Sequence, residues 1–92
     1  MELTNINTFN SETIFFQLSN NYCVKGTLNA DEGMLQEALD NFSRAIEANP
    51  NNYIAYFNRA TIKIDLGDLE GAKNDFNRFD FITKNEFDSL KL

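Results

Sequence analysis

Hydrophobic residues recur at spacings of three and four along most of the chain, which is the pattern of helices with one apolar face. Phe15, Leu18 and Tyr22 follow this pattern in the first third. It predicts one long helix over residues 12–30, while a break at residues 19–21, giving a short extra helix, stays open as the alternative. No segment alternates apolar and polar residues as a strand would. The expected fold class is therefore all-α.

Cap and turn residues divide the rest of the chain into further helices. Ser11 and Asp68 are suitable N-caps, because their side chains can accept hydrogen bonds from free backbone N–H groups. Gly33 and Gly67 can take the left-handed conformation that ends a helix, and Pro50 cannot continue one. Three more helices are expected over residues 34–48, 53–66 and 68–82.

The two ends of the chain are expected to differ from its middle. Residues 1–10 are mostly polar and predict a disordered or loosely docked tail. Thr83 and Glu86 have the spacing of a capping box, which marks the start of a helix. We therefore expect a separate capping helix over about residues 84–92, with Phe79 packed against it.

An internal repeat with an offset of 34 residues runs through the middle of the chain. Tyr22 returns as Tyr56, and Ala38 returns as Ala72. A fixed period of this length is typical of helical repeat arrays, in which each unit packs against its neighbours. The repeats are expected over about residues 19–52 and 53–84, inside a single domain of residues 11–92.

The repeat resembles the tetratricopeptide repeat (TPR) family, whose units are antiparallel helix-turn-helix pairs. The family's order of aromatic, small and turn residues is matched by Tyr22, Gly26, Gly33, Ala38, Phe42, Ala45 and Pro50, then by Tyr56, Ala60, Gly67, Ala72 and Phe76. The resemblance implies a fragment of an α-solenoid, with the small residues where paired helices cross. Departures from the family pattern occur at Lys25, Asn29, Arg59 and Lys63, and at Phe79 and Lys84, where the array is expected to end.

The resemblance also implies a concave groove, lined by the first helix of each pair, that binds a peptide or a helix. Carried onto this chain, the groove would be lined by Asn20, Cys23, Thr27, Asp31, Ile54, Phe57, Asn58, Thr61 and Asp65. Ile54 and Phe57 would anchor a partner's side chain, unless the chain's own N-terminal segment or a second copy covers them. Cys23 and Thr27 stand where a chaperone-binding subset of the family has lysine and asparagine, so that specific activity is not expected.

Composition restricts the remaining function classes. A net charge of −6 disfavours nucleic acid and anionic membranes as partners, because both attract basic proteins. One cysteine and no histidine leave no internal disulfide and no Cys/His metal cluster. No nucleophile motif and no phosphate-binding loop occur, so neither catalysis nor a cofactor is expected.

The N-terminal stretch has neither the basic start nor the apolar run of a signal peptide, and a cytoplasmic location is expected. Together these features predict a non-catalytic protein–protein interaction module, acting as an adaptor or scaffold. The alternative is a structural domain that associates with itself, for example as a homodimer, or a fragment of a longer repeat scaffold. Two repeats are fewer than the three or so that usually bury a continuous core.

Overall fold

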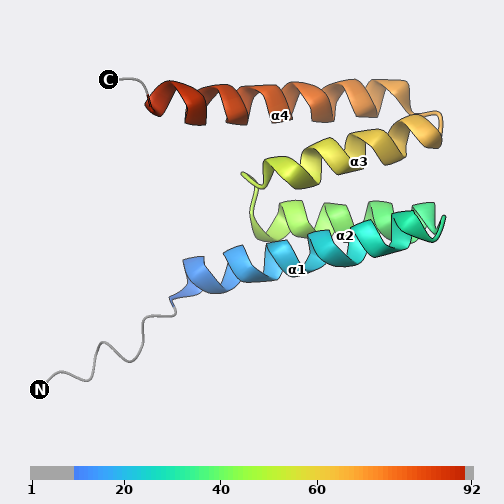
Figure 1. The fold of residues 1–92 in the computed structure, drawn as a ribbon, viewed down its shortest axis with the longest axis horizontal. Coiled ribbons are helices and arrows are strands. Elements are labelled where there is room, and N and C mark those ends of the chain that lie inside the picture. The colour runs from blue at the N-terminus through green and yellow to red at the C-terminus, as the bar shows by residue number, and fades with distance from the viewer. Residues whose placement is uncertain (1–9, 91–92) are drawn as a thin grey trace, which may run out of the picture.

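The computed structural model describes residues 10–90 and contains four helices in that range. They are α1 (Ser11–Asp31), α2 (Leu35–Ala48), α3 (Tyr53–Asp65) and α4 (Leu69–Ser89). Figure 1 shows them stacked in chain order, each running back along the one before it. No strand occurs in the described residues, which confirms the all-α prediction.

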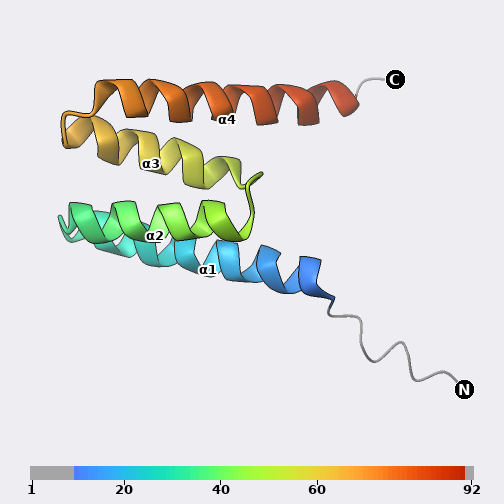
Figure 2. The same cartoon turned by 180° about the vertical axis from the view of Figure 1, so that it is seen from behind.

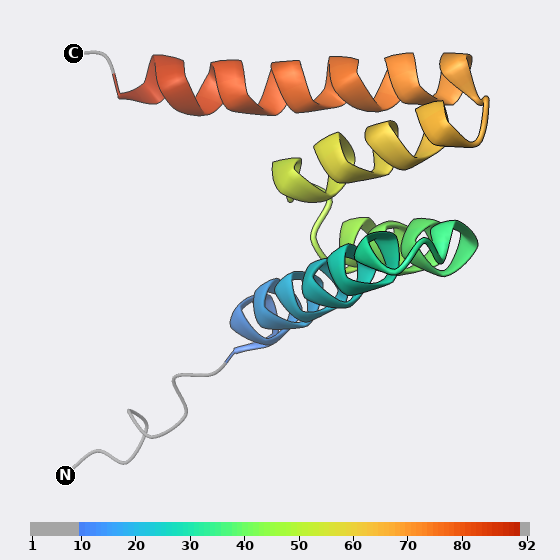
Figure 3. The same cartoon turned by 45° about the vertical axis from the view of Figure 1, so that its right-hand side comes forward.

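The four helices form a thin stack. α1 packs mainly on α2 and α3 on α4, while α2 joins the two pairs by packing on α3. Figures 2 and 3 show the same order of helices from behind and from an oblique side. A stack this thin covers few side chains completely, and Phe42 and Ser19 are the largest of these.

Cap and turn chemistry sets most helix boundaries where the sequence predicts them. α1 is unbroken from Ser11, so the open alternative of a break at residues 19–21 is excluded. Asp68 caps α4 by accepting a hydrogen bond from the Gly71 N–H, as predicted. Gly33 and Gly67 have φ of +76° and +87°, the left-handed conformation expected of them.

Two predicted boundaries are wrong. The N-cap of α1 is Asn10 rather than Ser11, because the Asn10 side chain accepts a hydrogen bond from the Thr13 N–H. The expected start of a capping helix after Thr83 does not occur, since α4 continues to Ser89. The Thr83 hydroxyl donates back to the Phe79 carbonyl, 2.8 Å away, as threonines inside helices do. The predicted tail covers residues 1–10; residues 1–9 lie outside the described residues, and Asn10 is the N-cap of α1.

Phe79 also has a different role from the one expected. Its ring lies 6.0 Å from the ring of Tyr53 and 5.2 Å from that of Phe57, measured between centroids. Both partners are on α3. Phe79 therefore holds α4 against α3 instead of packing a separate capping helix.

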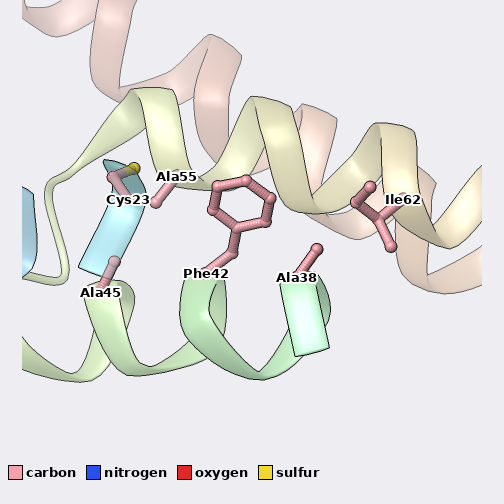
Figure 4. Packing of buried hydrophobic residues seen from close by; sticks show 6 residues of the cluster. All are labelled: Cys23, Ala38, Phe42, Ala45, Ala55 and Ile62. Atoms are coloured by element: carbon pink, nitrogen blue, oxygen red, sulfur yellow. The ribbon is translucent and has the colours of Figure 1, made fainter. Parts of the chain in front are cut away.

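The core lies where α1, α2 and α3 meet (Figure 4). Phe42 projects from α2 into this junction and is 1% exposed. A Cβ atom added at Gly26 of α1 would lie 2.7 Å from the Phe42 ring, closer than carbon atoms can approach. Glycine at this position therefore lets α1 approach α2 closely, as expected of a small residue at a crossing. Ala38, Ala60 and Ala72, predicted for the same role, are also buried.

A buried polar cluster joins the first repeat to the second. The Ser19 hydroxyl on α1 donates to the Ala45 carbonyl on α2 at 2.6 Å. It accepts a hydrogen bond from the Asn52 side chain at 2.8 Å, and Asn52 in turn caps α3 by accepting from the Ala55 N–H. Two side chains thus connect three helices, and Ser19 is completely buried.

Replacing Ser19 with Ala should lower the free energy of unfolding by about 1–3 kcal/mol, because it removes both hydrogen bonds of the hydroxyl and leaves a buried Asn52 N–H without an acceptor. Urea denaturation followed by circular dichroism would measure the change. Ser89→Ala is the control, since Ser89 is exposed and its hydroxyl bonds only within its own helix. An equal loss in both variants would contradict the role given to the Ser19 cluster.

The departures from the TPR pattern in the second repeat are explained by a buried carboxylate. Asp75 on α4 is 4% exposed and accepts two hydrogen bonds from Arg59, each 2.8 Å long. Lys63 approaches the same carboxylate to 3.0 Å, and Arg59 also donates to Ser43 on α2. The two basic residues are therefore part of the packing between α3 and α4.

The first repeat has an uncharged version of this arrangement. Asn29 and Asn41 are the residues 34 positions before Lys63 and Asp75, and they share a side-chain hydrogen bond of 2.7 Å. Lys25 lies over the Tyr22 ring in the first repeat, as Arg59 lies over the Tyr56 ring in the second. The two repeats thus use the same positions with different polar chemistry.

Candidate functional site

The largest hollow in the described structure is a groove of about 790 Å³ on the side where the two long helices extend furthest. The first turns of α1 (residues 11–18) and the last turns of α4 (residues 83–89) both project past the loop between α2 and α3 (Figures 1 and 2). We call these segments the α1 arm and the α4 arm. The inter-arm groove is lined by Glu12, Phe15, Phe16, Asn20, Ala48, Asn49, Pro50, Asn51, Asn52, Tyr53, Ile54 and Glu86.

The helix lengths explain why the groove stays open. α1 and α4 each have 21 residues, whereas α2 has 14 and α3 has 13. The longer helices therefore continue beyond their partners, and α1 and α4 make no contact with each other in residues 10–90. The turn at residues 49–52 and the start of α3 form the floor between them.

Apolar side chains in the groove are substantially exposed. The exposed fraction is 50% for Phe15, 55% for Phe16 and 53% for Ile54. Two of these side chains come from the α1 arm and the third from the start of α3. In this conformation they offer a large apolar surface to a ligand.

The charges of the groove are all of one sign. Glu12 on α1 and Glu86 on α4 are its only charged lining residues. Neither carboxylate has an ion-pair partner among residues 10–90. The groove therefore carries an acidic side chain on each of its arms and no basic one.

A second, smaller hollow of about 190 Å³ lies further along α1 and α3. Thr27 and Asp31 of α1 and Asn58 and Thr61 of α3 line it together with core residues. Both threonine hydroxyls donate to backbone carbonyls of their own helices. The structure thus brings together four of the residues predicted to line a concave surface, in a small pocket separate from the inter-arm groove.

The remaining predicted residues are placed in three different ways. Asn20 and Ile54 line the inter-arm groove, as the repeat offset between them suggests. Asp65 is exposed at the end of α3 and lines neither hollow. Phe57 is 42% exposed, but its ring also packs against Phe76 at 5.4 Å and contacts Phe79.

The prediction that Cys23 lines the groove is wrong. Cys23 is 8% exposed and belongs to the core cluster between α1, α2 and α3 (Figure 4). Burial raises the pKa of its thiol, and a hydrogen bond with Asn52 offsets only part of that rise. A buried thiol with a raised pKa is a poor nucleophile near neutral pH, so Cys23 has a packing role.

Across residues 10–90, no group of three or more Cys, Asp and Glu side chains is arranged to hold a metal ion. None of the four described helices combines the length and the apolar character needed to cross a bilayer.

Comparison with known proteins identifies the repeat. Two models described as tetratricopeptide repeat match the chain, one over residues 19–52 and one over residues 41–74, and together they cover more than half of it. The chain belongs to the tetratricopeptide repeat family. TPR units generally mediate protein–protein interaction, and the family is typically non-catalytic. No solved structure gives a significant match to the chain.

The TPR match extends to curated relatives. The chain is 35% identical to DnaJ homolog subfamily C member 3 of Mus musculus over 60 residues, which are 65% of this chain and 12% of that protein. It is 36% identical over 58 residues to the Tetratricopeptide repeat and J domain-containing co-chaperone DNJ1 of Fusarium oxysporum, covering 63% of this chain and 11% of that protein. Tetratricopeptide repeat protein 36 of Danio rerio is 42% identical over 52 residues, 56% of this chain and 28% of that protein. The chain thus spans about a tenth of the first two relatives.

The TPR pattern did not reveal part of the inter-arm groove. Glu12, Phe15 and Phe16 lie before the first repeat, and Glu86 lies after the second, so the offset of 34 residues says nothing about them. One signal was present in the sequence. Adjacent residues such as Phe15 and Phe16 point about 100° apart on a helix, so a single narrow apolar face cannot cover both.

Proposed function

We propose that the chain is a non-catalytic protein-interaction module that binds a peptide or a helix of a partner protein on the concave side of its repeats. The observation that carries this proposal is the inter-arm groove, where Phe15, Phe16 and Ile54 are each about half exposed around a preformed hollow. Exposed apolar side chains in a concavity are typical of binding sites. The smaller hollow at Thr27, Asn58 and Thr61 would extend the contact along α1 and α3.

The proposal takes only the binding role from the relatives. One of them is named a co-chaperone, but the chain covers 11% of it, so the activity of that whole protein is not transferred. Catalysis plays no part, because the groove is lined by two separated carboxylates and otherwise by apolar and amide side chains.

Replacing Ile54 with Ser should abolish capture of the partner while leaving the fold unchanged. Ile54 is 53% exposed, so its loss removes apolar contact surface from the groove but little from the core. The measurement is affinity capture from an extract of the native cell, with wild-type and variant chains compared by quantitative mass spectrometry. The captured protein must also bind the purified chain directly.

Leu28→Ser is the matched control, because Leu28 is 59% exposed on α1 and lines neither hollow. Partners that the Leu28 variant keeps and the Ile54 variant loses are groove ligands. If both variants retain the same partners, the groove is not the binding site. Phe57→Ala is a less informative test than the sequence suggests, because that ring also supports Phe76 and Phe79.

A second candidate function rests on the outer face of α1. Val24 and Leu28 are each 59% exposed there, and they would be covered if another repeat packed against α1. This favours a scaffold role, in which the repeats form part of a longer or self-associated array. Light scattering at micromolar concentration distinguishes the two: a monomer of 10.6 kDa supports the binding module, and a larger assembly supports the scaffold.

A further inference from the structure

We propose that the segment held in the inter-arm groove is basic, with a large apolar side chain flanked by Lys or Arg. This inference rests on the proposed function and names the class of ligand. It follows from the way the groove combines shape, apolar surface and charge.

Shape distinguishes the groove from the other apolar surfaces of the molecule. Several large apolar side chains are exposed elsewhere, including Val24 and Leu28 on α1 and Phe81 on α4, but they line none of the hollows. Phe15, Phe16 and Ile54 share one concavity whose walls come from two helices that do not touch. A side chain inserted between the arms would contact both walls at once, so its apolar surface would be removed from water.

The charged side chains of the groove favour a positively charged ligand. Glu12 and Glu86 lie on opposite arms of the groove, and both lack an ion-pair partner in the described structure. A lysine or arginine on each side of the apolar anchor would meet one of these carboxylates. An acidic segment would meet two like charges on a chain whose net charge is already −6, so it would be repelled.

One polar side chain that lines the groove is free to bind the backbone of such a segment. Asn20 is exposed, and its side-chain amide makes no hydrogen bond within residues 10–90. Asn52, in contrast, is already bonded to Ser19 and to the Ala55 N–H. Asn20 can therefore donate to a ligand's carbonyl or accept from its N–H without losing an internal contact.

Charge also distinguishes this ligand from two alternative occupants of the groove, a second copy of the chain and the segment before α1. A second copy of the chain would bring a further charge of −6. The segment before α1, residues 1–9, contains Glu2 but no Lys or Arg. The second copy would therefore be repelled by its net charge, and the first segment has no basic side chain to pair with Glu12 and Glu86.

The first step of the test selects random 12-residue peptides, displayed on phage, for binding to the immobilised full chain. The enriched peptides are then synthesised with a fluorescent label, and their affinity for the chain is measured by fluorescence anisotropy. We expect enriched sequences in which Lys or Arg flank Phe, Leu, Ile or Met. Binding should weaken at least fivefold in the Glu12→Gln/Glu86→Gln double variant and should fall with added salt. It should also be lost in Ile54→Ser.

The matched control is Glu37→Gln/Glu70→Gln, which changes the net charge equally. Both residues are exposed acids in first turns of helices, and neither lines the groove. This control variant should bind the enriched peptides as tightly as the wild type does. Equal weakening in both double variants would show that net charge alone attracts the peptides, and the inference would fail.

The remaining outcomes separate this inference from the proposed function. If the enriched peptides are neutral or acidic and their binding is lost in Ile54→Ser, the inference of a basic ligand is wrong. The proposed function as a binding module is then still supported. If the selection enriches no peptide, the result contradicts both the basic ligand and the proposed function. A dimer that is dissociated by Ile54→Ser would show a second copy in the groove and would overturn the basic ligand as its occupant.

Discussion

The Phe42→Ala variant should have a free energy of unfolding about 3–5 kcal/mol lower than that of the wild type. Phe42 is 1% exposed and fills the junction of α1, α2 and α3, and a stack this thin cannot collapse easily around the missing ring. A chain of this length has a total stability of roughly 5–14 kcal/mol, so the variant would be close to unfolding. Urea denaturation at low temperature, followed by circular dichroism, measures the loss.

Phe81→Ala is the matched control, because Phe81 is 56% exposed on α4 and its ring lies beside Arg78. Its loss should cost about 1 kcal/mol or less, in the range of cation–π contacts at exposed sites. A second substitution tests the crossing itself. Gly26→Ala should cost about 1–3 kcal/mol in the wild type through its clash with the Phe42 ring. In the Phe42→Ala background it should stabilise instead, since the higher helix propensity of alanine then acts without the clash. The same cost in both backgrounds would contradict the described contact.

The Asp75→Asn variant should lose about 3 kcal/mol, because it leaves Arg59 and Lys63 partly buried beside an amide instead of a carboxylate. Asp80→Asn on the same helix is the control, since Asp80 is exposed and should change stability by less than about 0.5 kcal/mol. The double variant Lys63→Asn/Asp75→Asn reproduces the amide pair of the first repeat and should lose less than Asp75→Asn alone. A larger loss would contradict the equivalence of the two repeats.

The pH dependence of the stability of the Asp75→Asn variant provides an independent test of the ion pair. Burial alone would raise the pKa of Asp75, but the hydrogen bonds from Arg59 and Lys63 outweigh it and place the pKa below its ordinary value. A carboxyl group with a lowered pKa in the folded state stabilises the protein above its unfolded pKa of about 4, and this contribution disappears as the pH falls through the folded pKa. The stability difference between wild type and Asp75→Asn should therefore shrink as the pH is lowered from about 5. A difference that stays constant over that range would contradict the ion pair.

The features that could be predicted from the sequence are those set by local chemistry. Helix positions follow from the three- and four-residue spacing, and Gly33 and Gly67 take the positive φ that a helix end requires. The resemblance to TPR units also predicted close crossings at Gly26 and Ala60, because small residues recur there at the repeat offset. All of these depend on residues within one helix pair.

Local patterns were insufficient where two structures compete for the same residues. The Thr83–Glu86 spacing fits a capping box, but nothing between these residues stops α4, and a threonine inside a helix bonds to a carbonyl of the preceding turn equally well. The same holds for Asn10 and Ser11, since either side chain could cap α1. A cap signal is decisive only where Gly or Pro interrupts the preceding helix.

The candidate site could not be predicted from local patterns, because it is formed by contacts between residues that lie far apart in the sequence. Ser19 and Asn52 are 33 positions apart, and their hydrogen bond turns the face of α1 that carries Cys23 into the core. The family resemblance alone does not include that hydrogen bond, and it therefore places Cys23 on the ligand-binding surface. Glu12 and Glu86 lie still further apart in the sequence, so only the packing of all four helices shows that they line one groove.

The unequal lengths of the helices have a thermodynamic consequence for ligand binding. The arms of α1 and α4 extend beyond the helices they pack on, and every residue in them is exposed or only partly buried. Short helical segments without a packed face are marginally stable in water, so these turns are the first expected to fray. A ligand between the arms must hold them helical, and the entropy lost in doing so reduces its affinity. Substitutions that raise the helix propensity of the arms, at positions outside the groove, should therefore tighten binding without adding a single contact to the ligand.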